Sequence, residues 1–202
     1  MWTAADGRRG RRWRATTHSP HGRLDHALLL EVSPDGRPVR LELASTDGLL
    51  TVHPDPDDRW VHGNVVTVHG VRHLAFPWTP ASQLLVAGSP VTAAVAARRL
   101  GRSIGVGEGA TFAALEVRRD LDVLPATWRA ARVGERSWRL LPAGGGEVIP
   151  VDLDPGGVPG GPELVDTWPL ELEVAVGEPP VAGEPPGRGQ RVDNRGRQRA
   201  GG

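Results

Sequence analysis

The sequence predicts a mainly β protein, in which a long, curled antiparallel sheet wraps around a single α-helix near residues 89–100. Two observations predict this fold class. About a dozen short apolar segments recur at regular spacing with turn-forming residues between them, as in sandwiches, barrels and rolled sheets. Only one stretch, near the middle of the chain, has a clear helical pattern. A sheet of that many strands tends to curl, and the helix would fill the space inside it.

Six strands are expected in the first 74 residues. Residues 33–36, Ser-Pro-Asp-Gly, have the residues of a tight turn between two of them. Residues 39–43 alternate apolar and charged side chains, as a half-buried strand does. Pro77 and Pro80 end the pattern, because proline cannot serve in a central ladder. The expected strands are residues 12–17, 26–32, 37–43, 49–53, 60–68 and 71–74.

The helix is expected over residues 89–100, after a short apolar strand at 83–87. Ser89 can accept a free backbone N–H as the N-cap, and Pro90 suits the first helical position. Four alanines favour helix formation, and Gly101 could end it. The alanines and Leu100 form one apolar arc of this helix, and its two valines form a second. A helix this apolar is usually buried on most sides.

Five more strands and the domain limits complete the predicted fold. Pro125 interrupts one of these strands. We expect a flexible N-terminus at residues 1–11 and a single domain over 12–176. Residues 177–202 are rich in Gly, Pro and Arg, and have too little apolar surface to repay ordering, so we expect them to be disordered. The expected strands after the helix are 111–117, 121–133, 137–141, 147–153 and 170–176.

Composition limits the function. The 202 residues include 24 Lys or Arg and 24 Asp or Glu, so no net field attracts nucleic acid or an anionic membrane. With no Cys, there is no disulfide, thiolate nucleophile or metal–thiolate site. The chain starts without the apolar segment of a secretory signal, and no apolar run reaches the roughly 18 residues of a membrane-spanning helix. We expect a cytoplasmic protein that is not membrane-spanning, binds no nucleic acid and uses no cofactor. Abundant Ala, Gly, Pro and Arg, with no Lys or Tyr, indicate a GC-rich bacterial genome.

One stretch has a family resemblance. Residues 89–100, Ser-Pro-Val-Thr-Ala-Ala-Val-Ala-Ala-Arg-Arg-Leu, align without a gap to a family pattern, Thr-Pro-Phe-Thr-Asn-Thr-Leu-Pro-Ile-Arg-Arg-Leu. Downstream segments keep the family's order of strands at residues 107–117, 121–125 and 134–139. The chain therefore resembles a bacterial family of glycolipid-binding proteins. The positions that keep step are Pro90, Thr92, Arg98, Arg99 and Leu100.

The resemblance implies a fold and a function. The family's fold is a spiral β-roll, in which a long antiparallel sheet wraps around one α-helix; it is dimeric in the known example and similar to periplasmic lipoprotein carriers. The family's Leu-Asp-Gly-Cys-x-Asp-Val-Asp segment is absent here, where residues 76–80 are Phe-Pro-Trp-Thr-Pro. Its Asn-Thr-Leu-Pro is Ala-Ala-Val-Ala at 93–96. The resemblance implies a non-enzymatic protein that binds a lipid or glycolipid between curved sheet and helix, and a homodimer.

Six residues are candidates for ligand binding. Arg98 and Arg99 come from the resemblance, and their guanidinium groups suit a phosphate or carboxylate headgroup. A basic last turn also suits the helix dipole, and could pair with a strand carboxylate such as Glu116. The other four are aromatic and could line a sugar or acyl cavity, although core packing explains them equally well. They are Phe76, Trp78, Trp128 and Trp138.

Two other classes of function stay open. A metal-dependent hydrolase would need at least three of His53, His62, His73 and Asp58 to converge, and their spacing matches no zinc signature. A purely structural domain would dimerise through an exposed sheet edge. The acidic residues 55–58 lack the Gly and Glu of a calcium loop, and no Ser lies in a nucleophile elbow.

Overall fold

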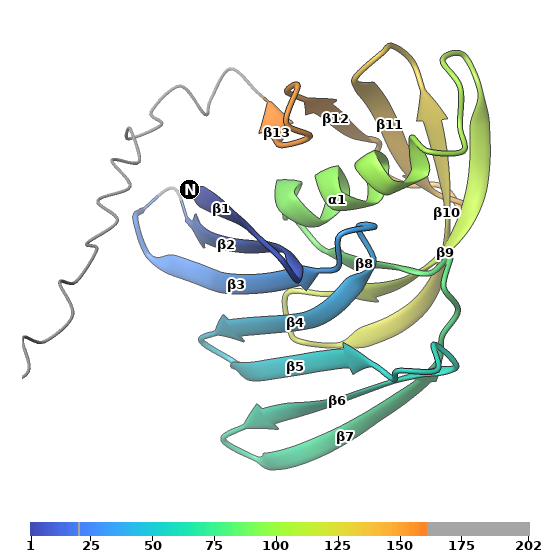
Figure 1. Ribbon diagram of the computed structural model, residues 1–202. Helices are drawn as coiled ribbons and strands as arrows, with labels where there is room; N and C mark the ends of the chain where they lie inside the picture. Colours follow the sequence, from blue (N-terminus) through green and yellow to red (C-terminus); the bar gives the residue numbers. More distant parts are fainter. Residues whose placement is uncertain (20, 161–202) are drawn as a thin grey trace, which may run out of the picture. The chain divides into compact units, whose positions relative to one another are not determined.

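Two sheets and one helix make up the part of the chain that the computed structural model describes, residues 1–19 and 21–160 (Figure 1). The first, sheet A, is an antiparallel meander of seven strands in sequence order, β1 to β7. Its strands are Trp2–Gly7 (β1), Gly10–His18 (β2), Leu24–Val32 (β3), Pro38–Ser45 (β4), Gly48–Pro54 (β5), Trp60–Thr67 (β6) and Gly70–Pro77 (β7).

Sheet B has six strands in the order β13-β12-β11-β10-β9-β8. Four of its five pairings are antiparallel, but β8 and β9 are parallel, and the helix α1 (Pro90–Leu100) crosses over between them. Among the described strands, this pair is the parallel exception to an otherwise antiparallel arrangement. The strands are Gln83–Val86 (β8), Gly109–Val117 (β9), Val123–Arg132 (β10), Ser137–Pro142 (β11), Ile149–Leu153 (β12) and Pro159–Gly160 (β13).

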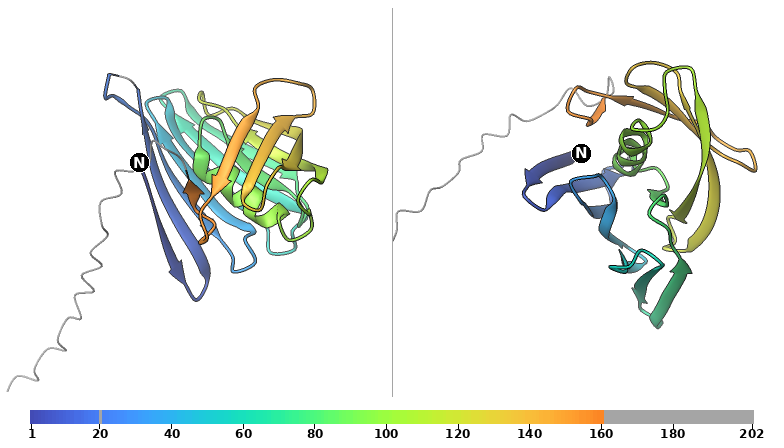
Figure 2. Two further views of the ribbon diagram at one scale, coloured as in Figure 1. Left: turned by 90° about the horizontal axis from the view of Figure 1, so that it is seen from above. Right: turned by 45° about the vertical axis from the view of Figure 1, so that its right-hand side comes forward.

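The helix α1 lies between the two sheets (Figures 1 and 2). Val91 and Val95 belong to the apolar cluster that contains the inward side chains of sheet A. The four alanines of α1 pack into a second cluster with Trp128, Trp138 and Leu140 of sheet B. The two apolar arcs of the helix thus pack into two different apolar clusters. The mainly β fold, with a curled sheet around one helix, is confirmed.

Both ends of α1 are where the sequence predicts them, but their contacts differ from the prediction. Ser89 is the N-cap with extended backbone, yet its buried hydroxyl makes no capping hydrogen bond. The hydroxyl of Thr92 instead accepts a hydrogen bond from the Val86 N–H (3.1 Å), which ties the first turn to β8. Gly101 has a helical φ of −61°, so it does not supply a left-handed ending. A side chain there would crowd Trp138, since an ideal Cβ would lie 3.2 Å from its ring.

The structure also differs from the prediction at the N-terminal residues. Where flexibility was expected at 1–11, the structure has the β1–β2 hairpin. Trp2 packs against Trp13 with ring centroids 5.8 Å apart, and this contact holds the edge strand β1 on the apolar cluster. The polar composition of this segment concealed the strand. The expected last strand at 170–176 and the expected disordered tail at 177–202 lie outside the described residues.

Pro77 and Pro125 lie in strands without disrupting a central ladder. Pro77 ends β7, which is an edge strand of sheet A. Pro125 lies in β10 opposite Leu115 of β9, but the ladder between β10 and β11 begins only at Trp128. At Pro125, β10 therefore has a partner on one side only, and its missing N–H leaves no gap in a ladder.

A buried histidine gives the stability a pH dependence. His26 on β3 is 7% exposed, and burial lowers its pKa below the ordinary value of 6.5, with Asp25 opposing this effect. The unfolded state therefore binds the proton more readily, so the free energy of unfolding should decrease as the pH falls below about 6.5. Urea unfolding between pH 7.5 and 5 measures this loss. The decrease in the free energy of unfolding should be smaller in His26→Gln than in the wild type. His53→Gln, which changes an exposed histidine, should show the same decrease as the wild type.

Candidate ligand-binding site

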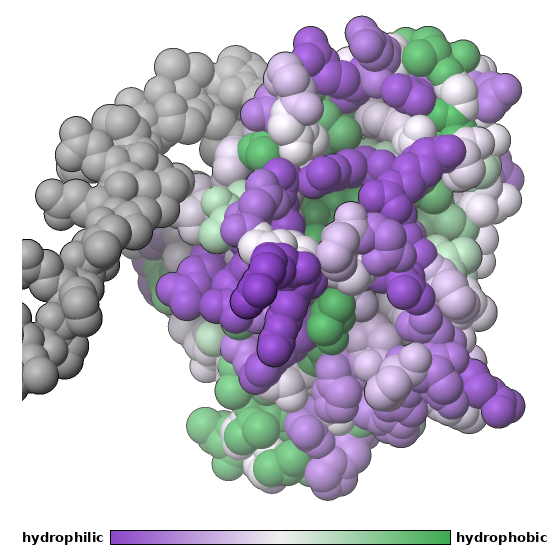
Figure 3. All heavy atoms as spheres, in the orientation of Figure 1, coloured by the Kyte–Doolittle hydropathy of each residue, from purple (hydrophilic) through white to green (hydrophobic). Residues whose placement is uncertain are grey.

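A cavity of about 140 Å³ lies where the last turn of α1 meets sheet A. One wall is the β1–β2 hairpin, and another is the turn between β3 and β4 at residues 33–36. The apolar part of the lining is Trp13, Val32 and Val95. Figure 3 shows hydrophilic residues in purple gathered around a recess at the level of α1. We call this space the arginine cavity, because its lining includes Arg11, Arg98, Arg99 and Arg102.

Three of these guanidinium groups have no acidic partner. Among the described residues, no carboxylate lies within salt-bridge distance of Arg98, Arg99 or Arg102. Arg99 donates to the carbonyl oxygen of Ser82 at 3.0 Å, and Arg102 makes a long contact to that of Pro34 at 3.5 Å. Within the described residues, no ion pair therefore compensates the positive charge of these three side chains.

The two carboxylates that line the cavity each form an ion pair with another arginine. Asp6 receives two hydrogen bonds from Arg11, at 2.6 and 2.8 Å, and this pairing lowers the pKa of the Asp6 carboxyl. Asp35 pairs with Arg37 at 2.7 Å and accepts a hydrogen bond from the Ser33 hydroxyl. Both carboxylates thus stay ionised and bound to their own partners. They do not neutralise the three arginines of α1 and the turn after it.

Burial and mutual repulsion act on the helix arginines. For Arg98, burial lowers the pKa first, and the neighbouring Arg11 lowers it further, against an opposing effect of Asp6. For Arg99, burial also lowers the pKa, and Asp35 opposes it. Arginine stays protonated in proteins in spite of such shifts. Burial and neighbouring positive charges therefore disfavour the charged guanidinium groups, and a bound anion would stabilise them.

Trp13, which also lines the cavity, carries a hydrogen-bond donor without a partner among the described residues. Its side chain is only 1% exposed, and its buried indole N–H has no hydrogen-bond acceptor among the described residues. The guanidinium of Arg11 lies over its ring, 5.4 Å from the centroid. Indole N–H is a donor only, as is guanidinium. The groups without partners around the arginine cavity are thus hydrogen-bond donors, and a ligand that fits them must supply acceptors.

The structure brings together only some of the six candidate residues. Arg98 and Arg99 both line the arginine cavity, and Glu116 contacts Arg118 at 3.8 Å rather than either of them. The four aromatic candidates lie elsewhere, in contact with the apolar clusters. Trp128 and Trp138 are buried against α1, Phe76 packs on the cluster of sheet A, and Trp78 borders a separate hollow of about 240 Å³.

The sequence did not point to three residues of the cavity, Arg11, Trp13 and Arg102. A signal existed for Arg102 alone. It follows Arg98 by four residues, the spacing that places two side chains on one helix face. Arg11 and Trp13 belong to a strand far away in the sequence, and only the packing of sheet A on α1 brings them to the site.

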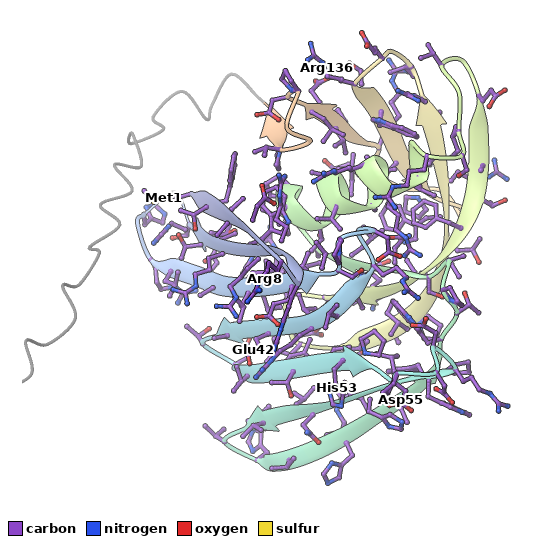
Figure 4. All side chains as sticks on the ribbon, in the orientation of Figure 1. Met1, Arg8, Glu42, His53, Asp55 and Arg136 are labelled. Carbon is purple, nitrogen blue, oxygen red and sulfur yellow. The ribbon has the colours of Figure 1, made fainter. Side chains whose placement is uncertain are left out.

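The residues of the metal-dependent alternative do not converge. His53 and His62 are neighbours on β5 and β6, with ring centroids 6.5 Å apart. His73 contacts Asn64 at 2.6 Å, and Asp58 pairs with Arg37 at 2.6 Å. Within the described residues, no group of three or more His, Asp or Glu is placed to hold a metal ion. Figure 4 shows His53 on the part of sheet A that lies away from α1.

A second surface is relevant to the structural alternative. The outer face of sheet A carries apolar side chains in one cross-strand row, and Figure 3 shows green residues at the ends of β5 to β7. Exposed apolar patches are typical of interaction sites. The exposed members of this row are Leu49 (41%), Val66 (42%) and Val71 (58%), and the turn between β6 and β7 adds Val68 (93%).

Comparison with known proteins identifies the fold only. No family model matches the chain, and no curated protein matches it. Among solved structures, it is similar to the crystal structure of a DUF1089 family protein from Pseudomonas aeruginosa, with a TM-score of 0.55 and 17% sequence identity. The match covers 79% of this chain and 86% of that chain. Among the described residues, no helix has the length and apolar character required to cross a membrane.

Proposed function

We propose that this chain is a binding protein for a lipid or glycolipid, whose anionic headgroup occupies the arginine cavity. One observation carries the proposal: three guanidinium groups without a carboxylate partner line a cavity together with Trp13, whose buried indole N–H has no acceptor among the described residues. Charge-assisted hydrogen bonds from guanidinium to phosphate or carboxylate are among the strongest in proteins. Arg98 and Arg99 are the principal ligands in this proposal.

The size of the cavity supports a headgroup rather than an acyl chain. Its volume of about 140 Å³ is similar to that of an engineered cavity of about 150 Å³ that holds one benzene molecule. Elsewhere along α1, Ala94, Ala96 and Ala97 are fully buried against sheet B. We therefore propose that only the headgroup of the lipid binds next to the helix, rather than the whole lipid between sheet and helix. In this proposal the acyl chains stay outside the protein.

Calorimetry with inorganic phosphate tests the proposal. We expect Arg99→Gln to weaken phosphate binding by about tenfold to a hundredfold, because a hydrogen bond to a charged group contributes roughly 1.5–3 kcal/mol. Arg98→Gln should weaken it similarly. Arg118→Gln, which removes the same charge from the turn between β9 and β10, is the matched control and should bind as the wild type does. Thermal unfolding of each variant checks that the fold is intact.

Two outcomes would contradict this function. One is a wild-type protein that binds no phosphate at low ionic strength. The other is equal affinity of Arg98→Gln, Arg99→Gln and the control, since the site would then lie elsewhere. Native mass spectrometry of the protein purified from cells separates the possible sources of the ligand. A co-purifying lipid that is lost in Arg99→Gln supports a headgroup, whereas a small soluble anion would overturn the lipid part of the proposal.

A further inference from the structure

A second hollow adjoins the arginine cavity. It has a volume of about 260 Å³ and lies between the last turn of α1, the turn that joins β10 to β11, and the loop at residues 154–157 after β12. Arg98 and Arg102 line both spaces, so the two spaces are neighbours along one pair of side chains. A ligand larger than one anionic group could extend from the first space into the second.

The second hollow offers acceptors as well as donors. The exposed guanidinium of Arg136 supplies donors, and Figure 4 shows this residue near β12. The exposed carboxylates of Glu135 and Asp154 supply acceptors. Among the described residues, none of these three groups takes part in a salt bridge. A hydroxyl group both donates and accepts hydrogen bonds, so this lining suits a group rich in hydroxyls.

A nucleobase would fit this hollow poorly. The aromatic residue in its lining, Trp138, is only 3% exposed, and Arg132 lies over its ring at 5.4 Å from the centroid. Arg132 is itself engaged with backbone carbonyl oxygens, at 2.9 Å from Ile104 and 2.6 Å from Glu135. No aromatic face in the lining is therefore open for a base to stack on. The contacts that remain are polar ones at the rim.

We infer that the ligand is a phosphorylated polyol, with its phosphate in the arginine cavity and its hydroxyls in the second hollow. This inference rests on the proposed function, and it specifies the class of headgroup. A phosphate monoester presents three acceptor oxygens, which match the three guanidinium groups without a carboxylate partner better than the two oxygens of a carboxylate do. Arg98 and Arg102 stand between the two parts of the ligand and can bind both.

Calorimetry with three soluble probes tests this inference: inorganic phosphate, glucose 6-phosphate and glucose. We expect the wild type to bind glucose 6-phosphate at least about tenfold more tightly than phosphate, and glucose weakly, because the polar contacts of the second hollow add to those of the phosphate. Arg136→Gln and Asp154→Asn should remove this gain and leave phosphate binding unchanged. Asn keeps the oxygen that accepts from the Val158 N–H, so the loop at 154–157 should keep its structure. Arg99→Gln should weaken both phosphate probes equally.

The possible failures are distinguishable. If phosphate binds but glucose 6-phosphate binds no more tightly, the inference is wrong and the proposed function stands. If phosphate itself does not bind, the proposed function is wrong and the inference falls with it. Vesicles that carry phosphatidylinositol 4-phosphate, compared with phosphatidylinositol, identify the source of the ligand. Vesicle binding that glucose 6-phosphate displaces supports a lipid headgroup as the phosphorylated polyol, and binding of the soluble probe alone supports a free sugar phosphate.

Discussion

Leu121→Gly should destabilise the protein less than Leu121→Ala, which is the reverse of the usual order. Leu121 is fully buried in the apolar cluster of sheet A, yet its φ of 64° lies in the left-handed region. Loss of the buried side chain should reduce the free energy of unfolding by about 2–5 kcal/mol in Leu121→Ala. Alanine retains the cost of a left-handed conformation, roughly 1–2 kcal/mol, which glycine avoids. We therefore expect Leu121→Gly to be more stable by about 1 kcal/mol.

Urea unfolding of both variants measures this difference. The matched control is Leu140, which is also fully buried but lies in β11 with an ordinary φ. Glycine in a strand is less stable than alanine by about 0.5–1 kcal/mol, so the order there should be the usual one. If Leu121→Gly proves less stable than Leu121→Ala, the left-handed backbone is not a source of strain. An ion pair between Asp122 and Arg72 of β7, at 3.3 Å, attaches the turn that contains Leu121 to sheet A.

The helix and most strands were predictable because each has a local signal. The apolar positions of α1 follow the helical period closely enough that its two arcs, which belong to different apolar clusters, can be identified in the sequence. The turn at residues 33–36 was predictable because Gly36 needs a positive φ, which is 79° in the structure. Strand β1 was missed because a strand at a sheet edge needs only one apolar face, and Trp2 and Ala4 supply it within a polar segment.

Features that depend on long-range packing had no such signal. The parallel pairing of β8 with β9 follows from the crossover through α1, and a four-residue apolar strand has the same pattern in either orientation. For the arginine cavity, the family resemblance pointed to Arg98 and Arg99. The opposing wall comes from Asp6 and Arg11, which no local pattern relates to α1. The second hollow needs residues from β10, β11 and the loop after β12 at once, so no single segment could indicate it.

Trp13→Phe should weaken phosphate binding without unfolding the protein, whereas Trp13→Ala should affect both. Trp13 is among the most buried side chains of the apolar cluster, and its truncation to alanine should cost about 3–5 kcal/mol in the free energy of unfolding. Phenylalanine keeps a packed ring and removes the unpaired indole N–H. If that N–H donates to the bound anion, its loss should lower the affinity by about tenfold to a hundredfold.

The matched control for Trp13→Phe is Trp128→Phe. Trp128 also has a buried indole N–H without an acceptor among the described residues, but it does not line the arginine cavity. Calorimetry with phosphate, together with urea unfolding, separates the two positions. Both variants should lose a similar amount of packing, and only Trp13→Phe should lose affinity. Equal phosphate affinity in the two variants would mean that the indole N–H of Trp13 does not contact the anion, and the arginines alone would then hold it.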